Sequence, residues 1–399
     1  MGRIVQCTSI AAVLVLAGCG SSSSADPPVG VDSGAEVGGG DIGGDTVADT
    51  GIGDGDATAD TCTTPACIRV VDLSTWKATT CAVLSEGHAF CWGDNRSGQV
   101  GDGTTTTPKL SPVLVKGLTN VVKIAAGVGH TCAILSDRTV NCWGVNGLGQ
   151  LGDGSKIDRA TPAPVVTAGG PLGNATQLAV GSTYSCALLG DKTVSCWGGG
   201  PGSDNTKATL VAGLTDIVAI DGDGRSICSL HATGAMTCFA ATTVTPTNVA
   251  QLALGDASRC VRLSDATVSC WGQGGSGELG DGLKTDRLTP GPVPGLTAVT
   301  DLASGQFHYC AIRTPTDVVC WGNNSSHQLG DGTTKNAISP QPFTGIAGGV
   351  TRFALGDDHS CAVGSDGKIY CWGLNRDGQL GDGTGKDQPL PTLVSVSAP

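Results

Sequence analysis

The 399-residue chain lacks most of the features that would point directly to an enzyme or to a nucleic-acid-binding protein. It has few aromatic residues (4%), only 2 Met, and no cluster of Lys or Arg, so nucleic acid binding has no electrostatic basis. It also contains no nucleophile elbow, no His-Glu-x-x-His motif and no phosphate-binding Gly-rich loop. We therefore expect a protein that is not an enzyme and that needs no cofactor or metal.

The first residues resemble a bacterial export signal. Arg3 supplies a positive charge, and the apolar run Ile10–Leu16 is too short to span a bilayer as a helix. The sequence Leu-Ala-Gly-Cys at 16–19 resembles the lipobox of bacterial lipoproteins, which implies a signal peptide over residues 1–18 and a lipid on Cys19. An ordinary signal peptide with a chance Cys is the alternative. Gly20 resembles the sorting residue of lipoproteins sent to the outer membrane, and the side on which the protein would be displayed stays open.

The stretch over residues 19–61 is expected to be a disordered linker. From Gly20 it carries nine acidic residues, no Lys or Arg and no aromatic residue, so it buries too little apolar surface to offset its ordering entropy. A calcium site at Asp54-Gly55-Asp56 is the alternative, but the full ligand spacing is missing. The remaining chain has 26 acidic and 22 basic residues, so the linker accounts for most of the net charge of −12.

The 18 Cys, in a chain that begins with a predicted export signal, indicate disulfides. Seven pairs share a spacing of ten residues, and Cys62 and Cys67 are close neighbours ahead of them. The seven pairs are Cys81 and Cys91, Cys132 and Cys142, Cys186 and Cys196, Cys228 and Cys238, Cys260 and Cys270, Cys310 and Cys320, and Cys361 and Cys371. In "CAVLSEGHAFC" two short strands flank a Ser-Glu-Gly turn, and such a hairpin sets the two Cys opposite each other. We predict that all sixteen are disulfide-bonded; zinc binding is the alternative, which the spacing fits poorly.

Each hairpin belongs to a longer repeat. A strand-like run ending in small residues precedes it, as in "VVKIAAG" ending at Gly127, and small residues suit an axis where strands converge. A loop such as "GQLGDGT" and a further strand-like run follow. Units of four strands recur mostly every 50 to 54 residues. The pattern predicts an all-β fold, a seven-bladed β-propeller of four-stranded blades over residues 62–399.

The segments "GVGHTCAI", "GDDHSCAV" and "CWGLNRDGQLGDG" resemble the regulator of chromosome condensation repeat, and the paired Cys resemble its secreted bacterial lipoprotein branch. The resemblance implies a seven-bladed propeller in which His130, His308 and His359 belong to the framework rather than to a metal site. It also implies a last blade completed from the other terminus, with "PTLVSV" near the C-terminus and "IRVVDL" from Ile68 as partners. We do not extend the family's nucleotide-exchange activity to this chain, because that function looks nuclear or cytosolic.

Two further repeated positions are interpreted as framework. A Trp directly after the second Cys in the complete repeats would bury against the neighbouring blade, with carbohydrate stacking as the alternative. The Asp of each Gly-Asp-Gly turn would form the turn, with metal binding as the alternative. These residues are Trp92, Trp143, Trp271, Trp321 and Trp372, and Asp102, Asp153, Asp281, Asp331 and Asp382. Repeats three and four have trimmed loops, either by degeneration or as a docking surface.

The short loop before the first Cys of each pair changes character while the framework repeats. Varied loops on a rigid scaffold usually carry recognition, and we expect them on one face. The candidate binding face comprises Val128, Thr183, Tyr184, Asp256, Gln306, Phe307, Asp357 and Asp358.

These observations together predict a non-enzymatic, lipid-anchored propeller of the cell envelope, at the outer membrane. It would bind an unidentified envelope or extracellular protein, touch the membrane only through its lipid, and be a monomer. A glycan- or cell-wall-binding adhesin is the alternative, favoured if Phe307 and Tyr184 are exposed. An unrecognised hydrolase is the third interpretation.

Overall fold

The computed structural model describes residues 69–396 except 201–202, 223, 225 and 240–245. Every regular element in this part of the chain is a β-strand. No helix there is long or apolar enough to cross a membrane. The predicted signal peptide, lipidation site Cys19 and linker, together with Cys62 and Cys67, lie outside the described residues.

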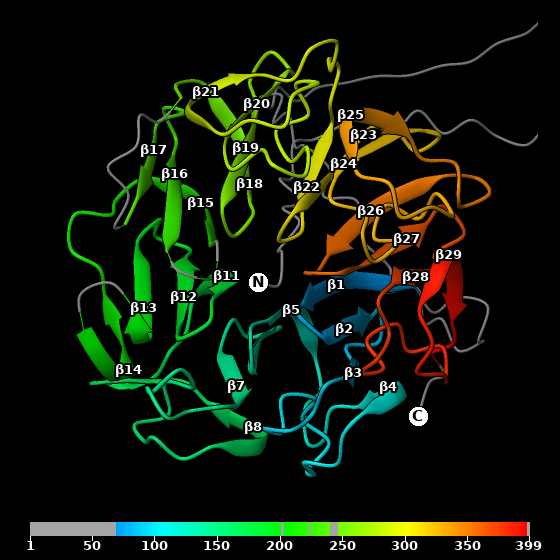
Figure 1. Cartoon of the computed structure of the whole chain (residues 1–399). Helices are drawn as coiled ribbons and strands as arrows, with labels where there is room; N and C mark the ends of the chain where they lie inside the picture. The colour runs from blue at the N-terminus through cyan, green and yellow to red at the C-terminus, as the bar shows by residue number, and fades with distance from the viewer. Residues whose placement is uncertain (1–68, 201–202, 223, 225, 240–245, 397–399) are drawn as a thin grey trace, which may run out of the picture. The chain divides into compact units, whose positions relative to one another are not determined.

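Seven antiparallel sheets stand around a central axis as the blades of a propeller, so the predicted fold class is confirmed (Figure 1). The strands of blades 1 to 4 are β1 (Val70–Trp76), β2 (Thr79–Leu84), β3 (Ala89–Gly93) and β4 (Lys109–Leu114); β5 (Val121–Ala126), β6 (His130–Leu135), β7 (Val140–Gly144) and β8 (Arg159–Pro164); β11 (Ala175–Val180), β12 (Tyr184–Leu189), β13 (Val194–Gly200) and β14 (Ser203–Leu210); and β15 (Ile217–Gly222), β16 (Ile227–His231) and β17 (Met236–Cys238). A two-stranded hairpin, β9 (Val166–Thr167) and β10 (Gly170–Pro171), follows blade 2.

Blades 5 to 7 each have four strands. They are β18 (Val249–Leu254), β19 (Ser258–Leu263), β20 (Val268–Gly272) and β21 (Arg287–Pro292); β22 (Asp301–Ser304), β23 (His308–Thr314), β24 (Asp317–Gly322) and β25 (Ala337–Pro342); and β26 (Val350–Leu355), β27 (His359–Gly364), β28 (Ile369–Gly373) and β29 (Gln388–Val394). The first strand of each blade lies nearest the axis, and its small residues, such as Ala125 and Ala126, are fully buried there (Figure 1).

The second and third strands of every blade form the hairpin that the Cys spacing predicts. Cys81 and Cys91 are directly opposed, with Cα atoms 4.1 Å apart, and Gly87 in the turn has a φ of +80°. The same disulfide recurs in the other six blades, where it joins Cys132 to Cys142, Cys186 to Cys196, Cys228 to Cys238, Cys260 to Cys270, Cys310 to Cys320, and Cys361 to Cys371. Since the sulfur atoms are bonded to each other, these pairs hold no thiolates for zinc.

These disulfides lie inside the blades and not on the surface of the molecule. Cys196 and Cys238 are half-buried, in the two blades with trimmed loops, and the other Cys of the seven pairs are buried. The buried third-strand members are Cys91, Cys142, Cys270, Cys320 and Cys371, each at most 3% exposed. The paired Cys are therefore framework residues that stabilise the hairpins, and they contribute nothing to the binding face.

The ring closes without the expected exchange of a strand between the two ends of the chain. Strand β29 pairs with β28, and β1 pairs with β2. The prediction of a shared blade is wrong because the first and last blades each take all four strands from consecutive chain. The closing seam depends on side chains instead: Thr80 Oγ1 and Trp92 Nε1 of blade 1 donate to the Gln379 carbonyl of blade 7, over 2.8 and 2.9 Å.

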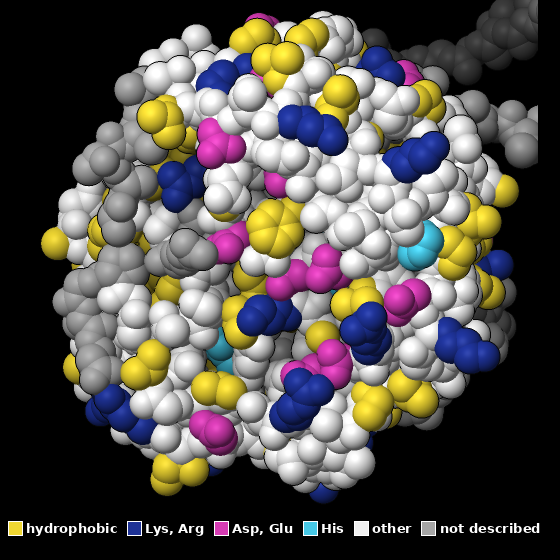
Figure 2. Space-filling model, in the orientation of Figure 1, with side chains coloured by type: hydrophobic (Ala, Val, Ile, Leu, Met, Phe, Trp, Pro, Cys, Tyr) yellow, Lys and Arg dark blue, Asp and Glu magenta, His cyan; other side chains and the backbone are white. Residues whose placement is uncertain are grey.

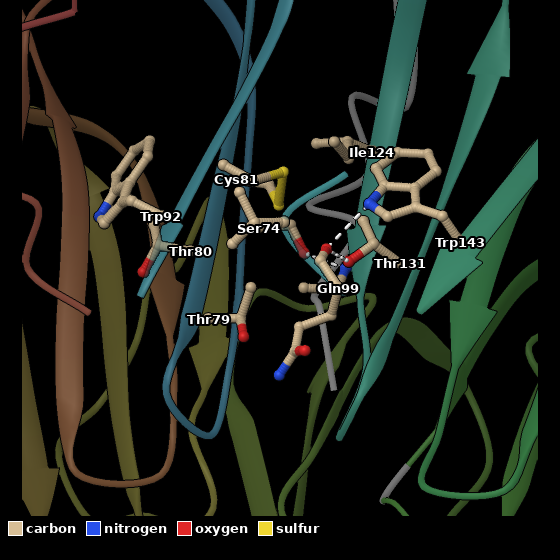
Figure 3. Close-up of a disulfide and its surroundings, with 12 residues drawn as sticks. Ser74, Thr79, Thr80, Cys81, Trp92, Gln99, Ile124, Thr131 and Trp143 are labelled. Carbon is tan, nitrogen blue, oxygen red and sulfur yellow. Dashed lines mark hydrogen bonds between the residues drawn. A yellow bond between two sulfur atoms is a disulfide. The ribbon is translucent and has the colours of Figure 1, made fainter. Parts of the chain in front are cut away.

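The same hydrogen-bond pattern recurs at other seams. The backbone carbonyl of Gln99 in blade 1 accepts from Trp143 Nε1 and Thr131 Oγ1 of blade 2, both at 2.8 Å (Figure 3). Equivalent Trp-to-carbonyl bonds join Trp197 to Gln150, Trp321 to Glu278 and Trp372 to Gln328. These indoles are at most 1% exposed. The repeated Trp is therefore a framework residue and offers no surface for stacking against a sugar.

A buried Asn organises the Gly-Asp-Gly loop from within. Asn375 Nδ2 donates to Asp382 Oδ1 and to the Thr384 carbonyl, both at 3.0 Å, and Asn375 Oδ1 accepts from the backbone N–H of Leu380 at 3.0 Å. Asp382 also accepts from the backbone N–H of Thr384 at 2.8 Å. This Asp therefore acts as a turn former. The same arrangement recurs around Asn95, Asn146 and Asn324.

Blades 3 and 4 depart from this pattern where the sequence predicts trimmed loops. Blade 4 has three strands among the described residues, and Phe239 takes the place of the repeated Trp. Trp271 of blade 5 is 2% exposed, yet its Nε1 finds no acceptor in the part of the chain that the structure describes. The acceptor in the other seams with this bond is a carbonyl of the loop after the third strand, and residues 240–245 of that loop in blade 4 lie outside the described residues.

Candidate binding face

The axial loops, defined as the loops between the first and second strands of the blades, carry the predicted binding residues except Tyr184, which is the first residue of β12. Seven of the eight are half-buried rather than freely exposed, and Tyr184 is buried. The half-buried ones are Val128, Thr183, Asp256, Gln306, Phe307, Asp357 and Asp358. The loops meet around the axis because each follows the inner strand of its blade.

Hydrogen bonds between neighbouring blades tie the axial loops together. In blades 5 to 7, the Asp256 N–H donates to the Gln306 carbonyl at 3.3 Å, and the Gln306 N–H donates to the Gly356 carbonyl at 3.1 Å. Gln306 Nε2 also donates to Asp256 Oδ2 at 3.2 Å. In blade 3, Ser182 donates to the Gly224 carbonyl of blade 4 through both its N–H and its Oγ. This rim is therefore held in place before any partner arrives, which lowers the ordering cost of binding.

The prediction that Tyr184 belongs to the binding face is wrong. Its side chain is 1% exposed, and its hydroxyl donates to the Ser226 carbonyl of the next blade at 2.7 Å. Tyr184 begins β12 where His130 begins β6, so it occupies the framework position and not a loop position. Room for its ring comes from Gly181, where an added Cβ would lie 2.3 Å from the ring.

The three repeated His also belong to the framework. Each is fully buried, and Nε2 of His130, His308 and His359 bonds to a hydroxyl of the next blade at 2.8 to 3.0 Å. Ser185, the partner of His130, donates its own proton to the Gln150 carbonyl, so Nε2 must carry the hydrogen of that bond. Burial lowers the pKa of all three to about 3. They are neutral near pH 7 and lie in separate seams.

Trp76 is the main axial residue that the sequence interpretation missed. It occupies the position of Gly127, and the residue that replaces His130 in blade 1 is the smaller Thr79. The indole is 3% exposed and packs against Ala126 of blade 2. A Cβ added to Gly224 of blade 4 would lie 3.3 Å from the indole, so Trp76 extends from blade 1 across the axis. The sequence does distinguish this position, because the strand-like run that ends at Trp76 is the one such run in the seven repeats that ends in Trp and not in Gly.

Two acidic residues of blade 7 differ in their surroundings. Asp357 has one buried oxygen, Oδ1, with no donor among the described residues, and burial raises its pKa to about 6 although the Lys77 ammonium opposes the shift. Asp358 accepts from Gln328 Nε2 at 3.2 Å, across the seam with blade 6. Burial raises the pKa of Asp358 as well. Asp358 therefore contributes to the seam in addition to lining the face.

A cavity of about 410 Å³ opens beside Phe307, between blades 5 and 6. Glu278 and Asp286 also line it. Figure 2 shows Asp and Glu side chains next to an apolar side chain near the centre of the ring, with Lys and Arg around them. No group of three or more His, Cys, Asp or Glu that could hold a metal ion occurs within the described ranges. The face thus offers mixed polar and apolar chemistry with one recess.

The repeated seams and the varied axial loops define a propeller that presents one rigid rim. Residues 39–398 match the family described as the RCC1-like domain, and the chain belongs to this family. This confirms the resemblance to the regulator of chromosome condensation repeat; the lipoprotein branch remains a proposal.

Relatives show how far the similarity extends. The chain is 28% identical over 349 residues to the ultraviolet-B receptor UVR8 of Arabidopsis thaliana, covering 85% of this chain and 72% of the receptor. It is 32% identical over 124 residues to human RCC2, but this covers 30% of this chain and 23% of that protein. Human HERC2, an E3 ubiquitin-protein ligase, is 27% identical over 79% of this chain, which spans 5% of HERC2.

Solved structures support the fold. Yeast RCC1 (Prp20), in a crystal structure with Kap60, superposes with a TM-score of 0.69 at 21% identity, covering 77% of this chain and 83% of Prp20. A second structure of Prp20p from Saccharomyces cerevisiae gives a TM-score of 0.68 at 20% identity, over 82% of this chain and 88% of that one.

Proposed function

We propose that the protein is a non-enzymatic binding propeller, held to the cell envelope by a lipid on Cys19, that binds a protein partner with its axial loops. The observation that carries the proposal is the rim of blades 5 to 7, where Asp256, Gln306 and Phe307 lie on loops hydrogen-bonded to one another. Such a rim combines a fixed backbone with half-buried polar and apolar side chains, which is the composition of many protein interfaces.

Its relatives support the same class of activity. Yeast Prp20 is described in complex with Kap60 and for its binding to Gsp1p and histones. Those partners are not transferred to this chain. The glycan alternative is weakened because Tyr184, one of its two expected aromatic contacts, is buried.

The test uses the full-length chain in detergent as an affinity bait for envelope extract. The variant carries Gln306→Ala and Phe307→Ala, and the matched control carries Leu288→Ala, a surface change at a residue that is 80% exposed on the outer strand β21. A protein retained by the parent and the control but lost with the double variant is the expected result. Equal retention by all three baits, or retention of cell-wall polysaccharide in place of protein, contradicts it.

The anchor is tested separately. Mass spectrometry of the mature N-terminus is expected to find a lipid on Cys19, and Cys19→Ser is expected to release the protein from the membrane fraction. A protein that stays in the membrane fraction after this substitution contradicts the anchor.

A further inference from the structure

The recess between blades 5 and 6 contains a buried carboxylate where four other blades have an amide. Glu278 is 4% exposed and stands in the position of a Gln that is at most 3% exposed elsewhere. The four Gln are Gln99, Gln150, Gln328 and Gln379. Like them, Glu278 accepts from the backbone N–H two residues earlier, from Ser276 at 2.8 Å. The Ser276 side chain and the backbone N–H of Glu278 also hydrogen-bond to this carboxylate. These donors lie within the same short loop, and the neighbouring blade 6 provides none among the described residues, at the wall of the cavity.

The neighbouring blade does not compensate this charge. At the seam between blades 6 and 7, Gln328 Nε2 donates to Asp358 at 3.2 Å. The residue equivalent to Asp358 in blade 6 is Phe307, since each precedes the first residue of the second strand. Phe307 lines the same cavity as Glu278 and has no polar side-chain atom. The seam between blades 6 and 7 joins an amide to a carboxylate at this position, whereas the seam between blades 5 and 6 places a carboxylate beside an aromatic ring.

A second acidic side chain stands at the rim. Asp286 is exposed and accepts from the backbone N–H of Gly274 at 3.1 Å. Burial raises the pKa of Glu278, and repulsion by Asp286 adds to the shift. A buried carboxylate without a cationic partner carries a desolvation cost, which a bound cation would offset.

We propose that this recess binds an arginine side chain of the partner protein, with the guanidinium between Glu278 and Asp286 and its plane against Phe307. The inference rests on the proposed function and names the chemistry of its partner. The cavity volume of about 410 Å³ accommodates one long side chain. A planar guanidinium suits this site because it stacks on an aromatic ring and donates to carboxylates at the same time. Arginine is also enriched at the centres of protein interfaces.

The experiment titrates the full-length chain in detergent with N-acetylarginine methylamide, followed by saturation-transfer NMR of the ligand. The matched probe is N-acetylcitrulline methylamide, which has the same shape without the charge. Arginine is expected to bind at least about tenfold more tightly than citrulline, and less tightly as salt is added. Equal binding of the two probes, or no binding of arginine, overturns the proposal.

Three variants locate the site. Glu278→Gln restores the residue of the other blades and keeps an acceptor for Ser276, so it is expected to fold at least as stably while losing about tenfold in arginine affinity. Phe307→Leu is expected to weaken binding about threefold. Asp387→Asn is the control, because Asp387 occupies in blade 7 the loop position of Asp286, beside Gln379 in place of a Glu. If Glu278→Gln binds the arginine probe as tightly as the parent, or if Asp387→Asn loses as much affinity as Glu278→Gln, the assignment of the site is wrong.

The partner experiment separates the two proposals. If Glu278→Gln captures the same envelope protein as the parent but neither binds arginine, the recess proposal fails and the binding function stands. If arginine binds as expected while no envelope protein is retained, the recess stands and the proposed partner class fails.

Discussion

Mild acid should weaken the folded propeller through its three buried His. The pKa of His130, His308 and His359 is about 3 in the folded state, against an ordinary value of 6.5. Below pH 6.5 the unfolded chain therefore binds more protons than the folded one. The free energy of unfolding consequently rises with pH up to about 6.5 and falls as the pH drops below that value.

The size of the effect follows from the two pKa values. Between pH 7 and pH 5, each His lowers the free energy of unfolding by about 2 kcal/mol. Buried carboxyls act in the opposite direction, because Asp357, with its pKa raised to about 6, binds its proton more tightly when folded. Asp72, whose pKa burial also raises, opposes the His in the same way. A comparison of variants isolates the His contribution from these groups.

Urea denaturation of the oxidised protein at pH 7 and pH 5 provides the assay. His308→Gln retains a donor for Ser360, and we expect its loss of stability between the two pH values to be about 2 kcal/mol smaller than that of the parent. His231→Gln, at the surface, is the control and should match the parent. Parallel pH dependences for the parent and His308→Gln would refute the reasoning, because the buried imidazole would then not be the group that titrates.

Three further changes test the framework, each by urea denaturation. Trp92→Phe should lower the free energy of unfolding by about 1 kcal/mol more than Trp271→Phe does, because Trp92 donates to the Gln379 carbonyl whereas Trp271 has no described acceptor. Equal losses in the two variants would argue against a stabilising bond across the seam. Gly381→Ala should lower the free energy of unfolding by more than about 2 kcal/mol, since the added Cβ would lie 2.6 Å from Trp92 Nε1. Gly117→Ala has nothing within 4 Å and should lower it by about 1 kcal/mol, because its backbone is left-handed. Similar values for the two variants would contradict the clash with Trp92. Replacing Cys132 and Cys142 of blade 2 by two Ala should cost about 2.7 kcal/mol from the ten-residue loop, and an unchanged midpoint would exclude this contribution.

The local parts of the fold could be predicted from the sequence because each blade repeats its own pairing information. The ten-residue Cys spacing specifies a hairpin register, and the structure has that register in every blade. Ring closure is different, since it depends on whether distant ends pair with each other or with their own neighbours. Pattern alone does not decide between these, and the expected strand exchange does not occur.

The candidate site was harder to predict, because side-chain size at one position determines the space at another. Tyr184 resembles a loop aromatic until Gly181 is seen to make room for its ring. Trp76 takes a Gly position because Thr79 is small. The repeat does not single out Glu278, because its backbone carbonyl accepts from a Trp of the next blade as the equivalent Gln carbonyls do. Only the structure shows that its carboxylate lines a cavity together with Phe307.

No strand is exchanged between blades 7 and 1, so only the segments that connect consecutive blades determine their order around the ring. Consecutive blades are joined by a short connection from an outer strand to the next inner strand, such as the six residues between β4 and β5. Blades 7 and 1 are neighbours in the ring although β29 and β1 lie at opposite ends of the described chain, yet the side-chain contacts between them match those of other seams. A linker from β29 to β1 would turn the chain into a covalent circle, and new ends could then be opened at another junction. The propeller can therefore be permuted so that the two ends of its chain lie at a different blade.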